Sequence, residues 1–182
     1  MPEEGDLAKT VADNRGVEPI RYPVTGQESP AKAKVSAINQ VSLVVKDLQK
    51  SVEDYWNIFG IGPWEIYSWE PSLVYDYEYH GRPAQAKARL AFTWVGGVQL
   101  ELIQPIAGDS IYNDFIMERG EGLHHFNFLV DDVSKSVSLL EQGGFPCVQR
   151  ARLGDNGAYV YIDMKPSKVI VGLVNSNPPS WF

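Results

Sequence analysis

Three polar residues stand at inward positions of otherwise apolar, strand-like stretches: Gln40, Glu101 and His125. Side chains alternate between the two faces of a β-strand, so each of these residues shares its face with residues two positions away. If the strands that carry them surround one cavity, an amide, a carboxylate and an imidazole point into it. Each group costs free energy to bury, and a functional site would explain that cost.

An internal repeat relates two of these residues. Residues 38–52 can be laid on residues 123–137 without a gap, and Gln40 then falls on His125. The repeat is far longer than a solenoid unit, so it predicts two copies of one supersecondary module.

The same repeat relates the ends of the two modules. One module ends in a strand at 99–103 and the other in a strand at 170–174, and Glu101 falls on Gly172. A pseudo-twofold axis between the modules would place equivalent residues opposite each other. The four positions would then line one cavity.

The periodicity predicts a strand, a helix and three strands in each module. We expect an α+β fold in which two βαβββ modules form a curved sheet around one cavity. The predicted segments are a polar N-terminal arm (1–34), a first module (35–108), a connecting helix and loop (109–122), a second module (123–177) and a C-terminal tail (178–182).

Local signals support these elements. Asp47 and Asp132 are placed to cap the helix of each module. Gly96-Gly97 lies between two strand-like runs and predicts a tight hairpin.

Composition narrows the class of protein. The hydrophobic content of 44% and the charged content of 21% are ordinary for a globular domain. A net charge of −7, with scattered basic residues, argues against binding to nucleic acid or to an anionic membrane. Cys147 is the single cysteine, and the first residues lack the pattern of a signal peptide, so we expect a cytoplasmic protein.

The chain resembles the vicinal oxygen chelate superfamily, which includes glyoxalase I, methylmalonyl-CoA epimerase, extradiol dioxygenases and the bleomycin and fosfomycin resistance proteins. The resemblance covers residues 38–175. The segments that carry it are 38–41, 100–105, 122–126 and 130–132, and the last three look most like the epimerase and glyoxalase branch.

This resemblance implies a metal site. The ligands would be Gln40, Glu101, His125 and a final glutamate at position 172, where this chain has glycine. The three remaining ligands are a weak set for zinc but acceptable for a harder ion that keeps water. The expected cofactor is a divalent metal, with Zn, Ni, Co and Mn left open.

Such an ion would act as a Lewis acid while a proton leaves the carbon beside an oxyanion. A base must accept that proton, and the carboxylate that the epimerase branch uses would fall near Gln85 and Lys87, where there is no acid. The candidates for this role are Asp163, His80 and Tyr161, with Asp76, Glu78, Glu65 and Tyr159 as further alternatives.

We expect the substrate to contact Trp94, Lys87, Arg89, His124 and Gly172. Lys87 and Arg89 could bind an anionic substrate, although an exposed strand edge explains them equally well. Strict alternation places His124 on the opposite face from His125, in a packing or entrance position.

Each proposed ligand also has a structural interpretation. Gln40 could serve packing alone, His125 could be a satisfied core histidine, and Glu101 could pair with Lys87 or Arg89 across the hairpin.

Two functions from different classes follow. The first is a metal-dependent lyase or isomerase that transfers a proton on an α-oxygenated carbonyl compound or an acyl thioester. The second is a metal-free protein of the bleomycin-resistance type that sequesters an apolar or aromatic ligand. Oxygenase chemistry is weaker, because it usually calls for two histidines and a carboxylate. The resemblance also implies a homodimer.

Overall fold

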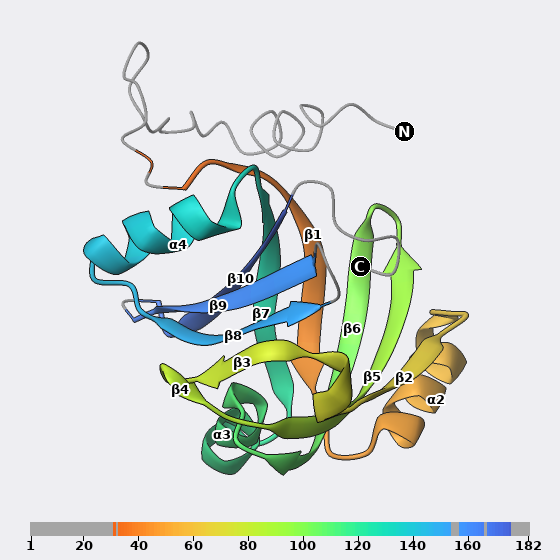
Figure 1. Cartoon of the computed structure of the whole chain (residues 1–182). Coiled ribbons are helices and arrows are strands. Elements are labelled where there is room, and N and C mark those ends of the chain that lie inside the picture. Colours follow the sequence, from red (N-terminus) through yellow and green to blue (C-terminus); the bar gives the residue numbers. More distant parts are fainter. Residues whose placement is uncertain (1–30, 32, 154–156, 166, 176–182) are drawn as a thin grey trace, which may run out of the picture. The chain divides into compact units, whose positions relative to one another are not determined.

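The computed structural model describes residues 31, 33–153, 157–165 and 167–175 (Figure 1). The predictions for the tail at 178–182, and for nearly all of the arm at 1–34, concern residues outside these ranges. In order, the elements are β1 (Val35–Val44), α2 (Leu48–Phe59), β2 (Glu65–Trp69), η1 (Pro71–Leu73), β3 (Tyr75–Tyr79), β4 (Arg82–Pro83), β5 (Ala86–Val95), β6 (Val98–Gly108), α3 (Ile111–Arg119), β7 (Gly122–Val130), α4 (Val133–Gln142), β8 (Cys147–Leu153), β9 (Gly157–Met164) and β10 (Val169–Asn175).

The two equivalent helices, α2 and α4, begin in the same way. The carboxylate of Asp47 accepts a hydrogen bond from the backbone N–H of Lys50 at 3.0 Å. The carboxylate of Asp132 accepts one from the N–H of Lys135 at 2.8 Å. Both predicted caps are confirmed, and each satisfies a backbone donor that the first turn leaves free.

The strands form one mixed sheet whose centre is the antiparallel pair β1–β7. On one side β1 pairs in parallel with β6, followed by β5 and β2. On the other side β7 pairs in parallel with β10, followed by β9 and β8. The two halves mirror each other in order and direction, which confirms the predicted α+β fold of two βαβββ modules in one curved sheet.

A hairpin inserted in the first module breaks this symmetry. Its strand β3 leaves its own module and pairs with β8 of the second, which extends the sheet to ten strands. Arg150 donates two hydrogen bonds of 2.9 Å to Glu78 across this pairing. The prediction of three strands after each helix is therefore incomplete for the first module.

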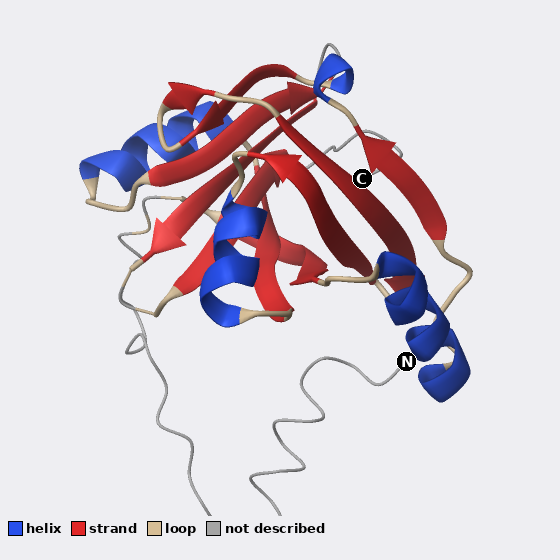
Figure 2. Ribbon diagram, turned by 90° about the horizontal axis from the view of Figure 1, so that it is seen from below, coloured by secondary structure: helices blue, strands red, loops and turns tan. Residues whose placement is uncertain are grey.

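Apolar side chains cover both faces of the sheet. On the outer face, α2 contributes Leu48 to a cluster with Leu102, and α4 contributes Val137 to a cluster with Leu173. Figure 2 shows the strands as an arch, with α2 and α4 at its two sides and α3 beneath it. The helix α3 therefore lies on the inner face, where the polar residues are expected.

Tyr77 anchors the inserted hairpin and yields a first prediction. It is 7% exposed, packs in the inner cluster and donates a hydrogen bond of 2.9 Å to the backbone carbonyl of Asp109. Tyr77→Phe should lower the free energy of unfolding by about 1 kcal/mol, the usual net value of one hydrogen bond. Urea denaturation measures the change. The control is Tyr75→Phe, on the same strand and 59% exposed, which should change stability little; equal losses in both variants would refute the role of the bond.

Candidate functional site

The pairing of β1 with its two neighbours brings the three predicted ligands together. Ser42 lies opposite Glu101 on β6 and opposite His125 on β7. Gln40, two residues earlier, shares this inner face. All three predicted ligands are buried, and His125 Nε2 lies 3.9 Å from Glu101 Oε2.

Ser42 connects the amide to the carboxyl group. Its hydroxyl lies 2.5 Å from Glu101 Oε2 and 3.2 Å from Gln40 Oε1. The side-chain nitrogen of Gln40 donates to the Gln99 side-chain oxygen at 2.6 Å. The Gln40 end that faces Ser42 is therefore the oxygen, which accepts hydrogen bonds. A hydroxyl has one proton and cannot donate to both neighbours. Ser42 therefore donates to the nearer oxygen, Glu101 Oε2, and Gln40 Oε1 accepts from the side-chain nitrogen of Asn127.

Burial sets the protonation of this carboxyl group and of the imidazole beside it. Burial raises the pKa of Glu101 to about 7, and the hydrogen bond with Ser42 only partly offsets the rise. Desolvation lowers the pKa of His125 well below its usual value. At neutral pH the carboxyl group is thus only partly ionised and the imidazole beside it is neutral, so the pair at 3.9 Å is not an ion pair.

The tautomer of His125 follows from its neighbour His124. A hydrogen bond to the backbone of Ile111 favours the charged form of His124, so the ring donates to that carbonyl. Its Nδ1 lies 2.8 Å from Nδ1 of His125. Desolvation lowers the pKa of His124 to about 4, so the ring is neutral and this Nδ1 accepts. His125 thus donates through Nδ1, and its buried Nε2, which has no partner, presents a lone pair.

The expected alternation of the two histidines fails because β7 bulges here. Ser42 pairs with His125 while Leu43 pairs with Leu123, so His124 has no residue opposite it. A bulge of this kind re-aims the extra side chain. His124 is 4% exposed and its ring packs against Phe115 of α3, so it supports His125 and does not lie on the opposite face.

The space beside Gly172, the fourth predicted ligand position, is occupied by the side chain of Asn127. A Cβ at residue 172 would lie 1.6 Å from Oδ1 of Asn127 and 3.2 Å from the ring of Tyr161. Asn127 donates through its side-chain nitrogen to Gln40 Oε1, and its own oxygen is buried without a partner. The corner that lacks a carboxylate thus holds an amide.

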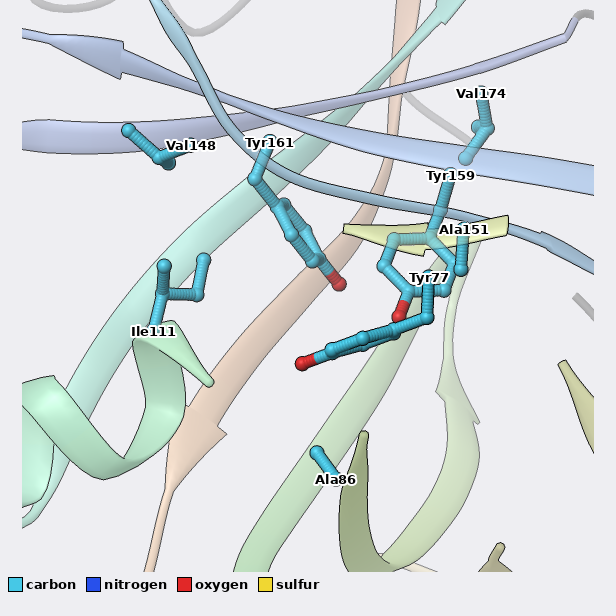
Figure 3. Packing of buried hydrophobic residues seen from close by; sticks show 8 residues of the cluster. All are labelled: Tyr77, Ala86, Ile111, Val148, Ala151, Tyr159, Tyr161 and Val174. Atoms are coloured by element: carbon cyan, nitrogen blue, oxygen red, sulfur yellow. The ribbon is translucent and has the colours of Figure 1, made fainter. Parts of the chain in front are cut away.

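Tyrosines close the site. Figure 3 shows the rings of Tyr77, Tyr159 and Tyr161 turned toward one another between β3 and β9. The ring of Tyr161 lies 4.6 Å from that of His125, and Tyr112 on α3 donates to the Tyr161 hydroxyl at 2.8 Å. Burial raises the pKa of Tyr112, Tyr159 and Tyr161 well above the usual value. These hydroxyls are protonated at neutral pH and can donate hydrogen bonds.

Among the candidate bases, the structure places Tyr161 and Asp163 on the inner face. Asp163 pairs with Ile170, which pairs with His125, so it lies on the same row of the sheet, two strands away. His80 lies in the β3–β4 turn, half exposed, with its ring 3.5 Å from Asp114.

The further candidates lie elsewhere, with one exception. Asp76 and Glu78 are paired with arginines of β8 across the inserted hairpin. Glu65 is exposed and accepts a hydrogen bond from the Tyr67 hydroxyl. Tyr159 is the exception, because it is buried on the inner face beside Tyr161.

Three of the residues expected at the substrate lie apart from Glu101. On β5, Ala88 and Leu90 pack on the inner face and Ala91 packs under α2, so Lys87 and Arg89 point to the outer face. Lys87 pairs with Glu70 at 2.9 Å, not with Glu101.

Trp94 stands on the inner face but at the rim of the sheet. It pairs with Gln99 at the tip of the β5–β6 hairpin and is 56% exposed. His124 and Gly172 are the two residues of the predicted substrate set that adjoin the buried network.

A groove on the structure lies away from this network. It has a volume of about 1460 Å³ and lies between α4 and the inserted hairpin, with Tyr77, Gln85, Val137 and Arg150 among its lining residues. None of the three predicted ligands lines it. The polar network is therefore a closed interior site and not the floor of this groove.

The residues fit a divalent ion. Nε2 of His125 is buried without a partner and lies 3.9 Å from Glu101 Oε2. Two ligands of one tetrahedral ion, each with a bond of about 2.1 Å, lie about 3.4 Å apart, so binding would draw these two atoms slightly together. A cation would also offset the cost of burying the carboxylate. No three histidine, cysteine or acidic side chains gather at one point among the described residues, so amides must complete the set.

Sequence reasoning missed Ser42, Asn127, Gln99 and Tyr112. The first two could have been found, because the repeat lays Ser42 on Asn127, both on the face of the predicted ligands. Gln99 shares a strand face with Glu101. Tyr112 reaches the site through the placement of α3, which no local pattern specifies.

Known proteins resemble this chain in sequence. The family model described as Glyoxalase/Bleomycin resistance protein/Dioxygenase superfamily matches residues 39–162. Mitochondrial methylmalonyl-CoA epimerase of Mus musculus is 26% identical over 133 residues, which are 72% of this chain and 67% of that protein. The uncharacterized protein YqjC of Bacillus subtilis is 36% identical over 74 residues, which are 40% of this chain and only 53% of that protein.

Solved structures agree in fold. A variant of methylmalonyl-CoA epimerase from Streptomyces coelicolor, in complex with 2-nitronate-propionyl-CoA, has a TM-score of 0.57 and 22% identity. The match covers 79% of this chain and 96% of that one. At this identity the likeness shows a shared fold. Among the described residues, no helix is both long and apolar enough to cross a membrane.

The protonated carboxyl group gives a second prediction, for metal-free protein in chelator. An unfolded Glu101 releases its proton near pH 4.5, whereas the folded protein holds it to about 7. The wild type should therefore lose stability relative to Glu101→Gln as the pH rises from 4.5 to 7. At 1.36 kcal/mol per pKa unit, the loss is roughly 3 kcal/mol.

Denaturant titrations at several pH values measure this difference. In the folded protein the lowered pKa values of the facing histidines and the raised ones of the facing tyrosines keep most of their titration outside this range. The same histidines are present in Glu101→Gln, so their titration in the unfolded chain cancels in the comparison. Glu65→Gln, at an exposed carboxylate, is the control and should follow the wild type. Wild-type and Glu101→Gln curves that stay parallel would contradict a buried protonated Glu101.

Proposed function

Because the chain belongs to the glyoxalase/bleomycin resistance protein/dioxygenase superfamily, we propose that it is a divalent-metal-dependent isomerase or lyase. It would move a proton on the carbon next to a carbonyl or acyl thioester. The observation that carries this proposal is the bare Nε2 of buried His125, which faces Glu101 at 3.9 Å in a network that includes Gln40.

The substrate class rests on the relatives. The mouse relative is named methylmalonyl-CoA epimerase, and the Streptomyces structure holds 2-nitronate-propionyl-CoA. An acyl thioester with a second oxygen near the acidic carbon is therefore the substrate class we favour over a hemithioacetal. Epimerisation, an isomerase reaction, is favoured over lyase chemistry for the same reason.

Gln40, Glu101 and His125 would hold the ion, and the ion would supply positive charge to an enolate oxygen. His124 holds the His125 ring in the tautomer that leaves Nε2 free. Tyr161 accepts from Tyr112, so its own proton is available to a substrate oxygen.

The proton on carbon needs a separate acceptor. Asp163 is the carboxylate among the candidates that lies on the inner face, in the row of His125. We propose it as the base in preference to His80, whose ring faces Asp114 in an exposed turn. Tyr161, protonated at neutral pH, is assigned the donor role.

A second function has support from one observation. Asn127 already donates to the oxygen that Gln40 would offer to a metal, and position 172 has no side chain. A metal-free binding protein is the class that such a blocked site would suit.

Metal content tests the proposal, and is the third prediction. Protein purified without chelator, or loaded with Ni, Co, Mn or Zn, should hold close to one divalent ion per chain by elemental analysis. Glu101→Ala and His125→Ala should lose it, because each removes a charged or lone-pair ligand. Glu65→Ala and His80→Ala change the same residue types outside the site and should keep it. A wild type that stays empty with all four metals would support the binding protein instead.

Solvent exchange tests the proton step, and is the fourth prediction. A 2-methylacyl thioester with a second carbonyl oxygen should gain deuterium at C2 in heavy water. Tyr161→Phe should slow this exchange about 10²-fold, the scale of one lost oxyanion donor, with metal content unchanged. Tyr77→Phe is the matched control, because its hydroxyl bonds a backbone carbonyl. Equal rates in wild type and Tyr161→Phe would remove Tyr161 from the reaction.

A further inference from the structure

Residues that pair across neighbouring strands form a row of the sheet. Two such rows divide the site into two equivalent halves. In one half, Ser42 lies between Glu101 and His125. In the other, Asn127 lies between Gln40 and Gly172. The repeat lays His125 on Gln40, Ser42 on Asn127 and Glu101 on Gly172, so each half has two outer positions and one middle position.

The two halves differ in whether the middle or the outer position carries the larger side chain. In the first half the middle residue is the small Ser42, and the outer Glu101 reaches inward past it. In the second half the middle residue is the larger Asn127, and the outer position has no side chain. The Asn127 oxygen occupies the place where a side chain at 172 would begin, 1.6 Å from its Cβ.

The orientation of Asn127 is set by the hydrogen bonds. Gln40 donates to Gln99, so its oxygen can only accept, and Asn127 turns its nitrogen toward that oxygen. The Asn127 oxygen is then left over Gly172 without a partner, although the residue is 1% exposed. A buried acceptor without a donor is costly, and an electropositive group would satisfy it.

We infer that Asn127 supplies, through Oδ1, the fourth ligand of the metal site, in place of the absent side chain at 172. This inference rests on the proposed function. The ligand set is then one imidazole, one carboxylate and two amide oxygens. It carries one negative charge, and its oxygen-rich character suits a harder ion such as Mn²⁺.

Calorimetric titration with Mn²⁺ and Co²⁺ tests the inference without any assay of activity. Asn127→Ala should weaken binding at least about 10-fold, and Co²⁺ bound to it should show a changed visible spectrum. Asn127→Asp, which adds charge at the same place, should tighten binding. The control is Asn57→Ala, at an exposed asparagine of α2, the helix that packs on the outer face of the sheet.

A paired substitution tests the exchange of sizes directly. Gly172→Glu alone should destabilise the fold, because its Cβ collides with Asn127. Together with Asn127→Ala it should fold and bind Mn²⁺ more tightly than Asn127→Ala alone. Failure of the second carboxylate to raise affinity in a folded double variant would overturn the inference.

The remaining outcomes separate the two ideas. A wild type that binds neither ion overturns both this inference and the metal-dependent function. A wild type that binds, with equal affinity in Asn127→Ala and Asn57→Ala, overturns the inference alone. Should Asn127→Ala fail to fold, Asn127→Asp decides, and an affinity equal to the wild type overturns the role of Oδ1.

Discussion

The antiparallel pairing of β1 with β7 is the constraint on which the rest of the site depends. These strands are equivalent in the two modules, and each is flanked by the last strand of its own module. Their register places Ser42 beside His125 and Gln40 beside Asn127, so both halves of the site are assembled from neighbours on a row. A slip of one residue would turn all of these side chains to the helix-covered face. The apolar contacts of α2 and α4 on the outer face therefore help to fix the strand register that brings the polar side chains together.

Burial gives the network its character. Inside the arch, each polar group must find a partner or bear the cost of desolvation. Most do so through a single chain of contacts that runs from Gln99 through Gln40 and Ser42 to Glu101. Among the described residues, four buried side-chain atoms have no partner: His125 Nε2, Asn127 Oδ1, Asn39 Oδ1 and Gln149 Nε2. The first two belong to the rows of Glu101 and Gln40 and offer lone pairs, which a cation would satisfy.

The sequence predicted the fold through its repeat, because equivalent strands and helix caps recur at a constant offset. The convergence of Gln40, Glu101 and His125 could be deduced in the same way. Three features could not. The pairing of β3 with β8 is a contact between distant segments, and the bulge at His124 is a local departure from alternation. The filling of the corner at Gly172 depends on the volume of a neighbour across the sheet, which a list of inward positions omits.

That last point explains how one fold can change its chemistry at a single corner. The residues at 127 and 172 compete for the same space, because they are adjacent on a row and face the same interior. A large residue at one position requires a small one at the other, as in volume-conserving changes in packed cores. Moving the ligand from the outer to the middle position leaves the backbone in place. It exchanges a carboxylate for an amide, and so alters the charge of the site by one unit while the sheet that builds it stays the same.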